Sequence, residues 1–270
     1  MKRFRKNKLA LFGLAVLVFF ALAAAAAPLL APFDPSAIVE SETLQPSLKH
    51  PFGTDDLGRD VFSRALFGAR ISLTVGFVAV AISIAIGVIL GAVSGYYGGL
   101  LDLAVMRFVD IMLAFPSIFL LLAIQAMLKP NIYNVMAVIG LTSWMGVARL
   151  VRGEVLSLKE RQFVEAERAI GASDARIIFR HILPNAAPPI IVAATLGMAG
   201  AILTESALSF LGLGVQPPMP SWGNMLMDSQ AYLVDAPWMA VIPGLLILFV
   251  VLSLYFVGEG LRDEFSPGER

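Results

Sequence analysis

Long apolar stretches, separated by shorter polar ones, follow one another along almost the whole chain. An α-helix needs about 20 largely apolar residues to cross about 30 Å of hydrocarbon. Five uncharged runs meet this requirement: residues 9–30, 71–94, 111–128, 186–204 and 238–258. A sixth run, residues 132–148, is shorter but sufficient. The third span is expected to begin before its uncharged run, near Leu103, with Arg107 and Asp110 in its first turns, where the headgroup layer or each other would satisfy them. The pattern therefore predicts an all-α membrane protein with six transmembrane helices.

The composition agrees with a membrane environment. The 270 residues are 58% hydrophobic and 15% charged, with a mean hydropathy of +0.80, whereas globular domains average about 45–50% apolar and about 25% charged. A net charge of zero argues against nucleic-acid binding, which needs clustered Lys and Arg in excess. Without cysteine, and with two histidines far apart in sequence, the chain is not expected to hold a disulfide or a metal ion.

Basic residues predict the orientation. Five Lys and Arg precede the first apolar run, so the positive-inside rule places residues 1–8 in the cytoplasm, residues 9–30 in the membrane and residues 31–70 outside. Residues 71–260 then form a five-helix core with turns at 95–102 (inside) and 129–131 (outside), a cytoplasmic loop at 149–187, and a cytoplasmic tail at 261–270. The loop at 149–187 contains seven Lys and Arg and the external stretch 212–237 contains none, which agrees with this orientation.

The first thirty residues have a second interpretation, a cleaved secretory signal. A basic start and small residues at 25–27 favour it. The apolar run of about 22 residues, however, exceeds the about 7–15 of a signal core. Its loss would also leave an odd number of spans, so we predict a retained helix.

The loop at 149–187 contains the pattern of a helix, a turn and a second helix. Between residues 161 and 170, one side of a helix collects the apolar side chains Phe163, Ala166, Ala169 and Ile170, and charged residues stand three and four positions apart at Arg161, Glu165 and Arg168. Gly171 permits the turn, Ser173 and Asp174 begin the second helix, and Pro184 is expected to end it. The alternative is an ordinary amphipathic connector on the inner membrane surface.

Residues 165–185, EAERAIGASDARIIFRHILPN, resemble the cytoplasmic "EAA loop" of ATP-binding-cassette (ABC) importer permeases. Five positions match that motif in register: Glu165, Ala166, Gly171, Leu183 and Pro184. Two depart from it, since Glu167 stands where a second Ala is usual and His181 where Ile is usual. Residues 50–73 and 205–223 also look like signatures of the dipeptide, oligopeptide and nickel permease family, and the chain resembles its C-type subunit.

The resemblance implies a type I ABC importer permease bundle in a bacterial inner membrane. One chain would form half of the translocation path beside a homologous second permease, while an external solute-binding protein delivers a di- or oligopeptide. Two ATPase subunits would bind ATP and Mg and dock on the cytoplasmic loops, here through Arg161, Phe163, Glu165, Ala166, Ala169, Gly171 and Pro184. The sequence has no GxxxxGK[ST] phosphate loop, so we expect no enzyme activity in this chain. Nickel and glutathione stay open as substrates.

Two further sets of polar residues each allow two interpretations. Residues 54–60 place Asp55, Asp56, Arg59 and Asp60 at helical spacing, which predicts a self-paired, capped helix or a surface that meets the binding protein. Glu205 and Ser209 lie near the outer end of the fifth span. An ionisable group there is either part of the translocation path or a gate, or a hydrogen-bonded structural carboxylate.

Glycine, proline and tryptophan add expectations about packing. Gly87, Gly91 and Gly95 recur every fourth residue, which favours close helix packing in a membrane. Pro116, Pro188, Pro189 and Pro243 predict bends. Trp222 and Trp238 are expected at the membrane interface.

Two rival functions come from other classes. An ion-coupled secondary transporter would need midplane ionisable groups or related halves with broken helices, and no such repeat is visible in the sequence. A membrane-embedded enzyme would need catalytic side chains gathered at one depth, which the sequence does not provide.

Overall fold

The computed structural model describes residues 3–129 and 131–265, and within those ranges the chain forms helices and no β-strand. The longer helices are α1 (Lys8–Ala25), α3 (Val61–Tyr97), α4 (Gly99–Ala114), α5 (Ser117–Met127), α6 (Ile132–Lys159), α9 (Leu183–Phe210) and α11 (Trp238–Phe265). The short elements are η1 (Phe4–Lys6), α2 (Ala27–Leu30), α7 (Gln162–Ala169), α8 (Asp174–Arg176), η2 (Ile177–Ile182), α10 (Trp222–Asp228) and η3 (Gln230–Tyr232). Residues 1–2 of the basic start, 130 of the external turn and 266–270 of the tail lie outside the described residues.

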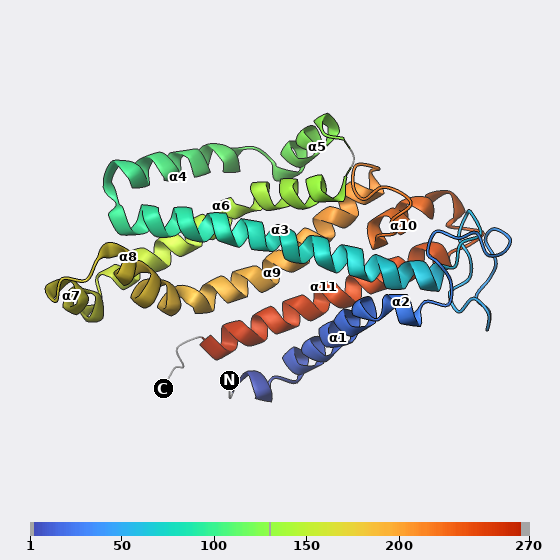
Figure 1. The fold of residues 1–270 in the computed structure, drawn as a ribbon, viewed down its shortest axis with the longest axis horizontal. Coiled ribbons are helices and arrows are strands. Elements are labelled where there is room, and N and C mark those ends of the chain that lie inside the picture. The colour runs from blue at the N-terminus through green and yellow to red at the C-terminus, as the bar shows by residue number, and fades with distance from the viewer. Residues whose placement is uncertain (1–2, 130, 266–270) are drawn as a thin grey trace.

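The long helices lie side by side along one axis (Figure 1). α3 packs mainly against α6, α9 packs against α3 and α11, and α1 packs against α11. α1 begins and α11 ends at the end of the bundle that carries α7 and α8, whereas α10 and the connection before α3 lie at the other end. The structure therefore groups these segments at two ends, as the predicted orientation requires.

Five of the six predicted spans are continuous helices. α1, α3, α6, α11 and the stretch from Asp174 to Phe210 are long and apolar enough to cross a membrane, and the count is six if the bent pair α4 and α5 is taken as one span. That pair is bent by 85°, so the continuous helix predicted over residues 111–128 is wrong. Phe115 adopts an extended backbone (φ −86°, ψ 133°) because the ring of Pro116 disfavours helical geometry at the residue before it.

α3 is longer than predicted at both ends. It contains 37 residues, about 56 Å at 1.5 Å per residue, so it extends beyond the about 30 Å of hydrocarbon. Asp60 caps its start by accepting a hydrogen bond from the amide of Ser63 (2.8 Å). The helix predicted over residues 54–60 is wrong: Gly58 has a φ of +75° in a turn, and Thr54 forms an isolated β-bridge with Asp60. The predicted external segment, 31–70, thus ends as a helix.

The glycine stripe of α3 lies against α6, as predicted. A Cβ atom on Gly87 would lie 2.6 Å from Cβ of Val147, and one on Gly91 would lie 2.5 Å from the carbonyl oxygen of Ala148. Both distances are shorter than van der Waals contact. Side chains at these positions would therefore force α3 and α6 apart.

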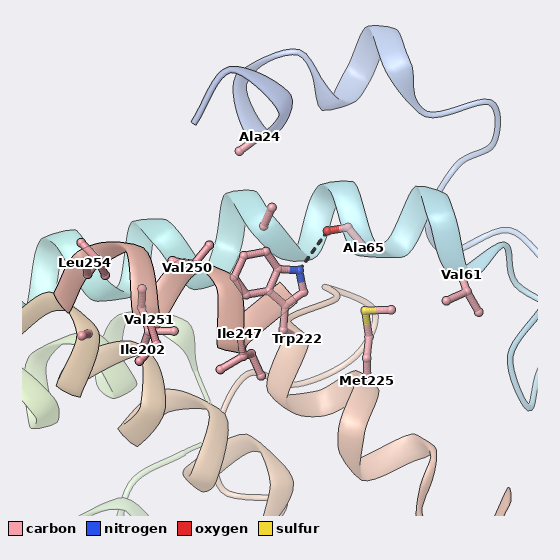
Figure 2. Close-up of a cluster of buried hydrophobic side chains, with 12 residues drawn as sticks. Ala24, Val61, Ala65, Ile202, Trp222, Met225, Ile247, Val250, Val251 and Leu254 are labelled. Atoms are coloured by element: carbon pink, nitrogen blue, oxygen red, sulfur yellow. Dashed lines mark hydrogen bonds between the residues drawn. The ribbon is translucent and has the colours of Figure 1, made fainter. Parts of the chain in front are cut away.

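A core cluster around Trp222 joins α1, α3, α9, α10 and α11 (Figure 2). Trp222 is fully buried, and its indole Nε1 donates a hydrogen bond to the carbonyl oxygen of Ala65 (3.1 Å). Phe20 of α1 meets its ring edge-on, with 5.8 Å between the centroids. The prediction of an interfacial Trp222 is wrong, because α10 folds inward and uses the ring as core.

Candidate coupling surface and neighbouring polar sites

α7 ends at Gly171 in a Schellman turn. The amide of Ala172 donates to the carbonyl of Glu167, and the amide of Gly171 donates to the carbonyl of Arg168, both at 3.0 Å. Gly171 has a φ of +80°, in the left-handed region that favours glycine. An added Cβ would meet no heavy atom within 4 Å, so the requirement for glycine is conformational and not steric. The predicted turn is confirmed.

The predicted apolar face of α7 points away from the rest of the chain. Phe163 and Ile170 are 38% and 75% exposed, and Ala166 and Ala169 are exposed as well. The opposite side of the helix is held by Val164, which is fully buried. We call Phe163, Ala166, Ala169 and Ile170 the outer face of α7; all four are exposed, Phe163 only in part.

Polar contacts fix α7 and α8 to the end of α3. The Tyr96 hydroxyl donates to Oδ1 of Asp174 (2.7 Å), and the guanidinium of Arg168 lies 5.6 Å from the centroid of the Tyr96 ring. Arg161 has an extended backbone at the start of α7, and Glu165 is exposed. Within the described residues no ion pair joins Arg161, Glu165 and Arg168, although their spacing would permit one.

Val164 anchors α7 in a small core that the sequence analysis did not single out. This core joins α3, α6, α7 and η2 through Ala92, Tyr96, Val151, Val155, Val164, Ile177, Ile178 and Ile182. The apolar positions around Ile177 were the available signal for it. Because the core connects the loop to two long helices, α7 is mounted rigidly on the bundle.

The two departures from the EAA motif meet in the structure. Oε1 of Glu167 lies 3.4 Å from Nε2 of His181, and Oε2 of Glu167 lies 3.9 Å from Nε of Arg176. The side chains of Glu167 and His181 are 19% and 25% exposed, so both are largely covered. Glu167 and His181 stand 14 residues apart in the sequence, and nothing in that separation indicates a contact.

Pro184 does not end a helix, so that prediction is wrong. The backbone is helical from Asp174 through η2 and on to Phe210. η2 is a π-helical segment, in which the amide of Leu183 donates to the carbonyl of Ile178, five residues back. This wider turn accommodates the proline ring, which in a regular α-helix clashes with the carbonyl four residues before it.

Glu205 and Ser209 lie in a fully buried hydrogen-bond network. Ser72 donates to Oε2 of Glu205 (3.1 Å), and Ser209 donates to Oε1 (2.7 Å). The two hydroxyls in turn accept bonds from the amides of Trp222 (3.3 Å) and Val215 (3.0 Å). The carboxylate thus joins α3, α9 and the connection to α10. This geometry is that of a hydrogen-bonded structural carboxylate; a role in translocation or gating stays a prediction.

A charged network connects the segment before α3 to α10. Nε of Arg59 donates to Oδ2 of Asp55 (2.6 Å), while Nη2 of Arg59 (3.3 Å) and Nη2 of Arg64 (3.1 Å) donate to Oδ2 of Asp228. Asp56 is a weaker partner of Arg59, at 3.4 Å. The predicted self-pairing is confirmed, and it extends 169 residues along the chain to Asp228.

Burial and ion pairing shift the pKa values of several acidic side chains at this end of the bundle. Burial raises the pKa of Asp228 and that of Asp56 above their usual range. The hydrogen bond from Lys49 lowers the pKa of Glu40. Asp228 therefore carries a desolvation cost that its arginine partners offset in part.

Two family models match the sequence. One, described as binding-protein-dependent transport system inner membrane component, matches residues 83–268. The other, described as the N-terminal transmembrane domain of oligopeptide transport permease C, matches residues 1–48.

Full-length relatives are also similar. The dipeptide transport system permease protein of Alkalihalophilus pseudofirmus is 49% identical over 267 residues, which cover 98% of this chain and 88% of that protein. The glutathione transport system permease protein of Escherichia coli is 44% identical over 268 residues, with the same coverage.

Solved structures share the fold. A chain of the MetNI methionine ABC transporter in an inward-facing conformation aligns with a TM-score of 0.53 at 23% identity, over 74% of this chain and 95% of that one. A chain of an amino acid ABC transporter with histidines aligns with a TM-score of 0.55 at 16% identity, over 75% of this chain and 94% of that one.

Proposed function

We propose the function of this chain from one premise: it belongs to the family of binding-protein-dependent transport system inner membrane components. In this proposal the chain is the permease subunit of an ATP-driven importer and forms half of a translocation path beside a homologous second permease. The observation that carries the proposal is the outer face of α7, which is apolar and exposed on a helix that the buried Val164 holds to the bundle.

The outer face of α7 docks on an ATPase subunit. Phe163, Ala166 and Ala169 supply apolar contact, while Arg161 and Glu165 are exposed beside them for polar contacts. Gly171 and Pro184 set the backbone path behind this surface. ATP and Mg are bound by two separate ATPase subunits. Their closure moves α7, and the differential binding of the ATPases to two permease conformations supplies the drive.

The docking proposal fixes the sidedness of the chain. The end with α7 faces the cytoplasm, so both the start of α1 and the end of α11 lie there too. The other end, with α10 and the charged network, faces an external solute-binding protein. The proposed location is the bacterial inner membrane.

Short peptides are the proposed substrates. The 49% identical relative is named for dipeptide transport, which favours di- or oligopeptides. The 44% identical relative is named for glutathione transport, so glutathione, itself a small peptide, is the second candidate. Nickel has no comparable support, because the described residues contain no group of three or more metal-ligand side chains.

Reconstitution tests the proposal directly. The chain is purified with its encoded neighbours, placed in liposomes and supplied with ATP and the cognate binding protein. We expect ATP hydrolysis to rise with a dipeptide-loaded binding protein. Substituting Phe163→Ser should abolish this rise while the chain still inserts, because the apolar contact is lost. Leu100→Ser, at an exposed apolar position at the start of α4, is the matched control.

Two results would contradict the proposal. If the isolated chain transports substrate without ATPase subunits, it is a secondary transporter. If Phe163→Ser retains full coupling, α7 is a connector on the membrane surface and not a docking element.

A further inference from the structure

A charged cluster joins α4 and α6 near the end of the bundle that carries α7. Nε and Nη2 of Arg152 donate to the two carboxylate oxygens of Asp102, at 2.5 and 2.6 Å. Arg149 donates to Oδ1 of Asp110, while Arg107 lies 3.7 Å from Oδ2 of the same group. We call these five residues the α4–α6 cluster. Each carboxylate already has one close guanidinium partner, so Arg107 is the surplus cation.

The cluster lies at the start of α4, the first half of the bent pair. Ser94, the last residue of the apolar run of α3, donates its hydroxyl to Asp102 (2.5 Å). Asp110 follows eight residues later on α4, about 12 Å further along that helix at 1.5 Å per residue. In the proposed orientation, with α7 in the cytoplasm, Arg107 and Asp110 therefore lie on the bilayer side of Asp102.

The deep members of the cluster are open on one side. The side chains of Arg107, Asp110 and Arg149 are 73%, 45% and 50% exposed. A cavity of about 520 Å³ lies beside the cluster, and its lining includes Asp102, Arg107, Asp110 and Arg152. A separate cavity of about 660 Å³ lies between α6, α9 and α11 and does not touch the cluster. Ionised side chains at membrane depth face water or protein and not lipid. The cavity favours water on this side.

We propose that the α4–α6 cluster is a binding site for a carboxylate of the transported substrate, with Arg107 as the group that contacts it. This inference rests on the proposed function. Short peptides, glutathione included, carry a free carboxylate, and the planar guanidinium of arginine binds a carboxylate through two parallel hydrogen bonds. Because Arg107 is mostly exposed, water screens the contact and keeps it weak, which suits a substrate in transit.

The test uses the complete transporter with its binding protein in liposomes. Uptake of one dipeptide is compared with uptake of the same dipeptide amidated at its carboxyl end, and the ratio of the two is taken for each variant. The binding protein is unchanged, so its own preference cancels between variants. For Arg107→Gln we expect the ratio to fall about fivefold, the equivalent of about 1 kcal/mol. Arg107→Lys keeps the positive charge, so we expect most of the preference for the free dipeptide over the amidated one to remain.

Two controls make the result decisive. Arg70→Gln removes an exposed arginine of α3 outside the cluster and should leave the ratio unchanged. Arg107→Met is a second neutral variant, so failure of one variant to assemble leaves the other. An unchanged ratio would overturn the inference. An equal loss of uptake for both peptides would overturn it as well, and would indicate that Arg107 contacts the other permease. Failure of the proposed function is separate: the unaltered complex would then show no ATPase response to a loaded binding protein.

Discussion

The carboxylate of Glu167 and the imidazole of His181 lie 3.4 Å apart, on α7 and η2 respectively. Each replaces an apolar residue that is usual in the EAA loop. The two departures from that motif are therefore neighbours in space, largely covered side by side between α7 and η2. The pair therefore helps to set the angle between α7 and the helix that follows.

Replacing both Glu167 and His181 should cost less stability than the two single replacements added together. Glu167→Ala alone or His181→Ile alone removes one member of a largely covered contact that is not a hydrogen bond, at a cost of up to about 1 kcal/mol. We expect each single variant to lower thermal stability and ATPase coupling, and Glu167→Ala with His181→Ile to recover much of both. A double-mutant cycle on melting temperature and coupled ATPase rate measures this. Strictly additive losses would show that the two residues act independently.

The turn at Gly171 should be sensitive to any side chain. Gly171→Ala places a Cβ in a left-handed conformation that costs about 1–2 kcal/mol, although no neighbour obstructs it. We expect normal insertion, weaker binding of the ATPase and reduced uptake, with a larger effect for Gly171→Val. Gly153→Ala is the control, because Gly153 lies in helix α6 with equally open surroundings. Normal uptake by Gly171→Val would refute this account of the turn.

Glu205 offers a test that separates structure from gating. Glu205→Leu removes the acceptor of two buried serine hydroxyls and should destabilise the chain by about 1–3 kcal/mol, measured as a lower melting temperature in detergent. Glu205→Gln retains one carbonyl acceptor and should be milder. If the Gln variant is as stable as the parent and yet transports nothing, the carboxylate has a direct part in translocation.

The charged network at the other end should depend on Asp228. Asp228→Ala removes one of the two carboxylates that Arg59 and Arg64 share, while Asp55 remains, so the cost should be below the about 3–5 kcal/mol of a fully broken buried pair. We expect faster proteolysis of the segment before α3, measured with protease added from outside to oriented vesicles. Asp34→Ala, in the same segment but outside the network, is the control. Equal protection of both variants would show that the network does not hold this segment.

Local patterns in the sequence were sufficient for much of the fold. The apolar runs located six spans, the spacing of Phe163, Ala166 and Ala169 identified the outer face of α7, and Gly171 predicted the turn. These features depend on residues close in sequence. The helix, the glycine turn and the hydrophobic length are properties of each segment alone.

Other features depend on partners that are distant in sequence. The sequence alone predicts an interfacial Trp222, whereas in the structure its indole donates to Ala65 of α3. The sequence alone predicts a helix end at Pro184, whereas a π-helical turn before it lets the helix continue. Glu167 and His181 become a pair only because η2 returns beside α7. No local pattern contains these contacts, so they could not be predicted from one sequence.

The helical stretch from Asp174 to Phe210 has a mechanical consequence. Its 37 residues correspond to about 55 Å of rod. One end of the stretch belongs to the buried core that holds α7. The other end carries Glu205, whose hydrogen-bond network reaches α3 and the connection before α10. In the proposed coupling, a tilt of about 5° of this stretch about one end would displace the opposite end by about 5 Å, which would link the cytoplasmic side of the bilayer to the external side.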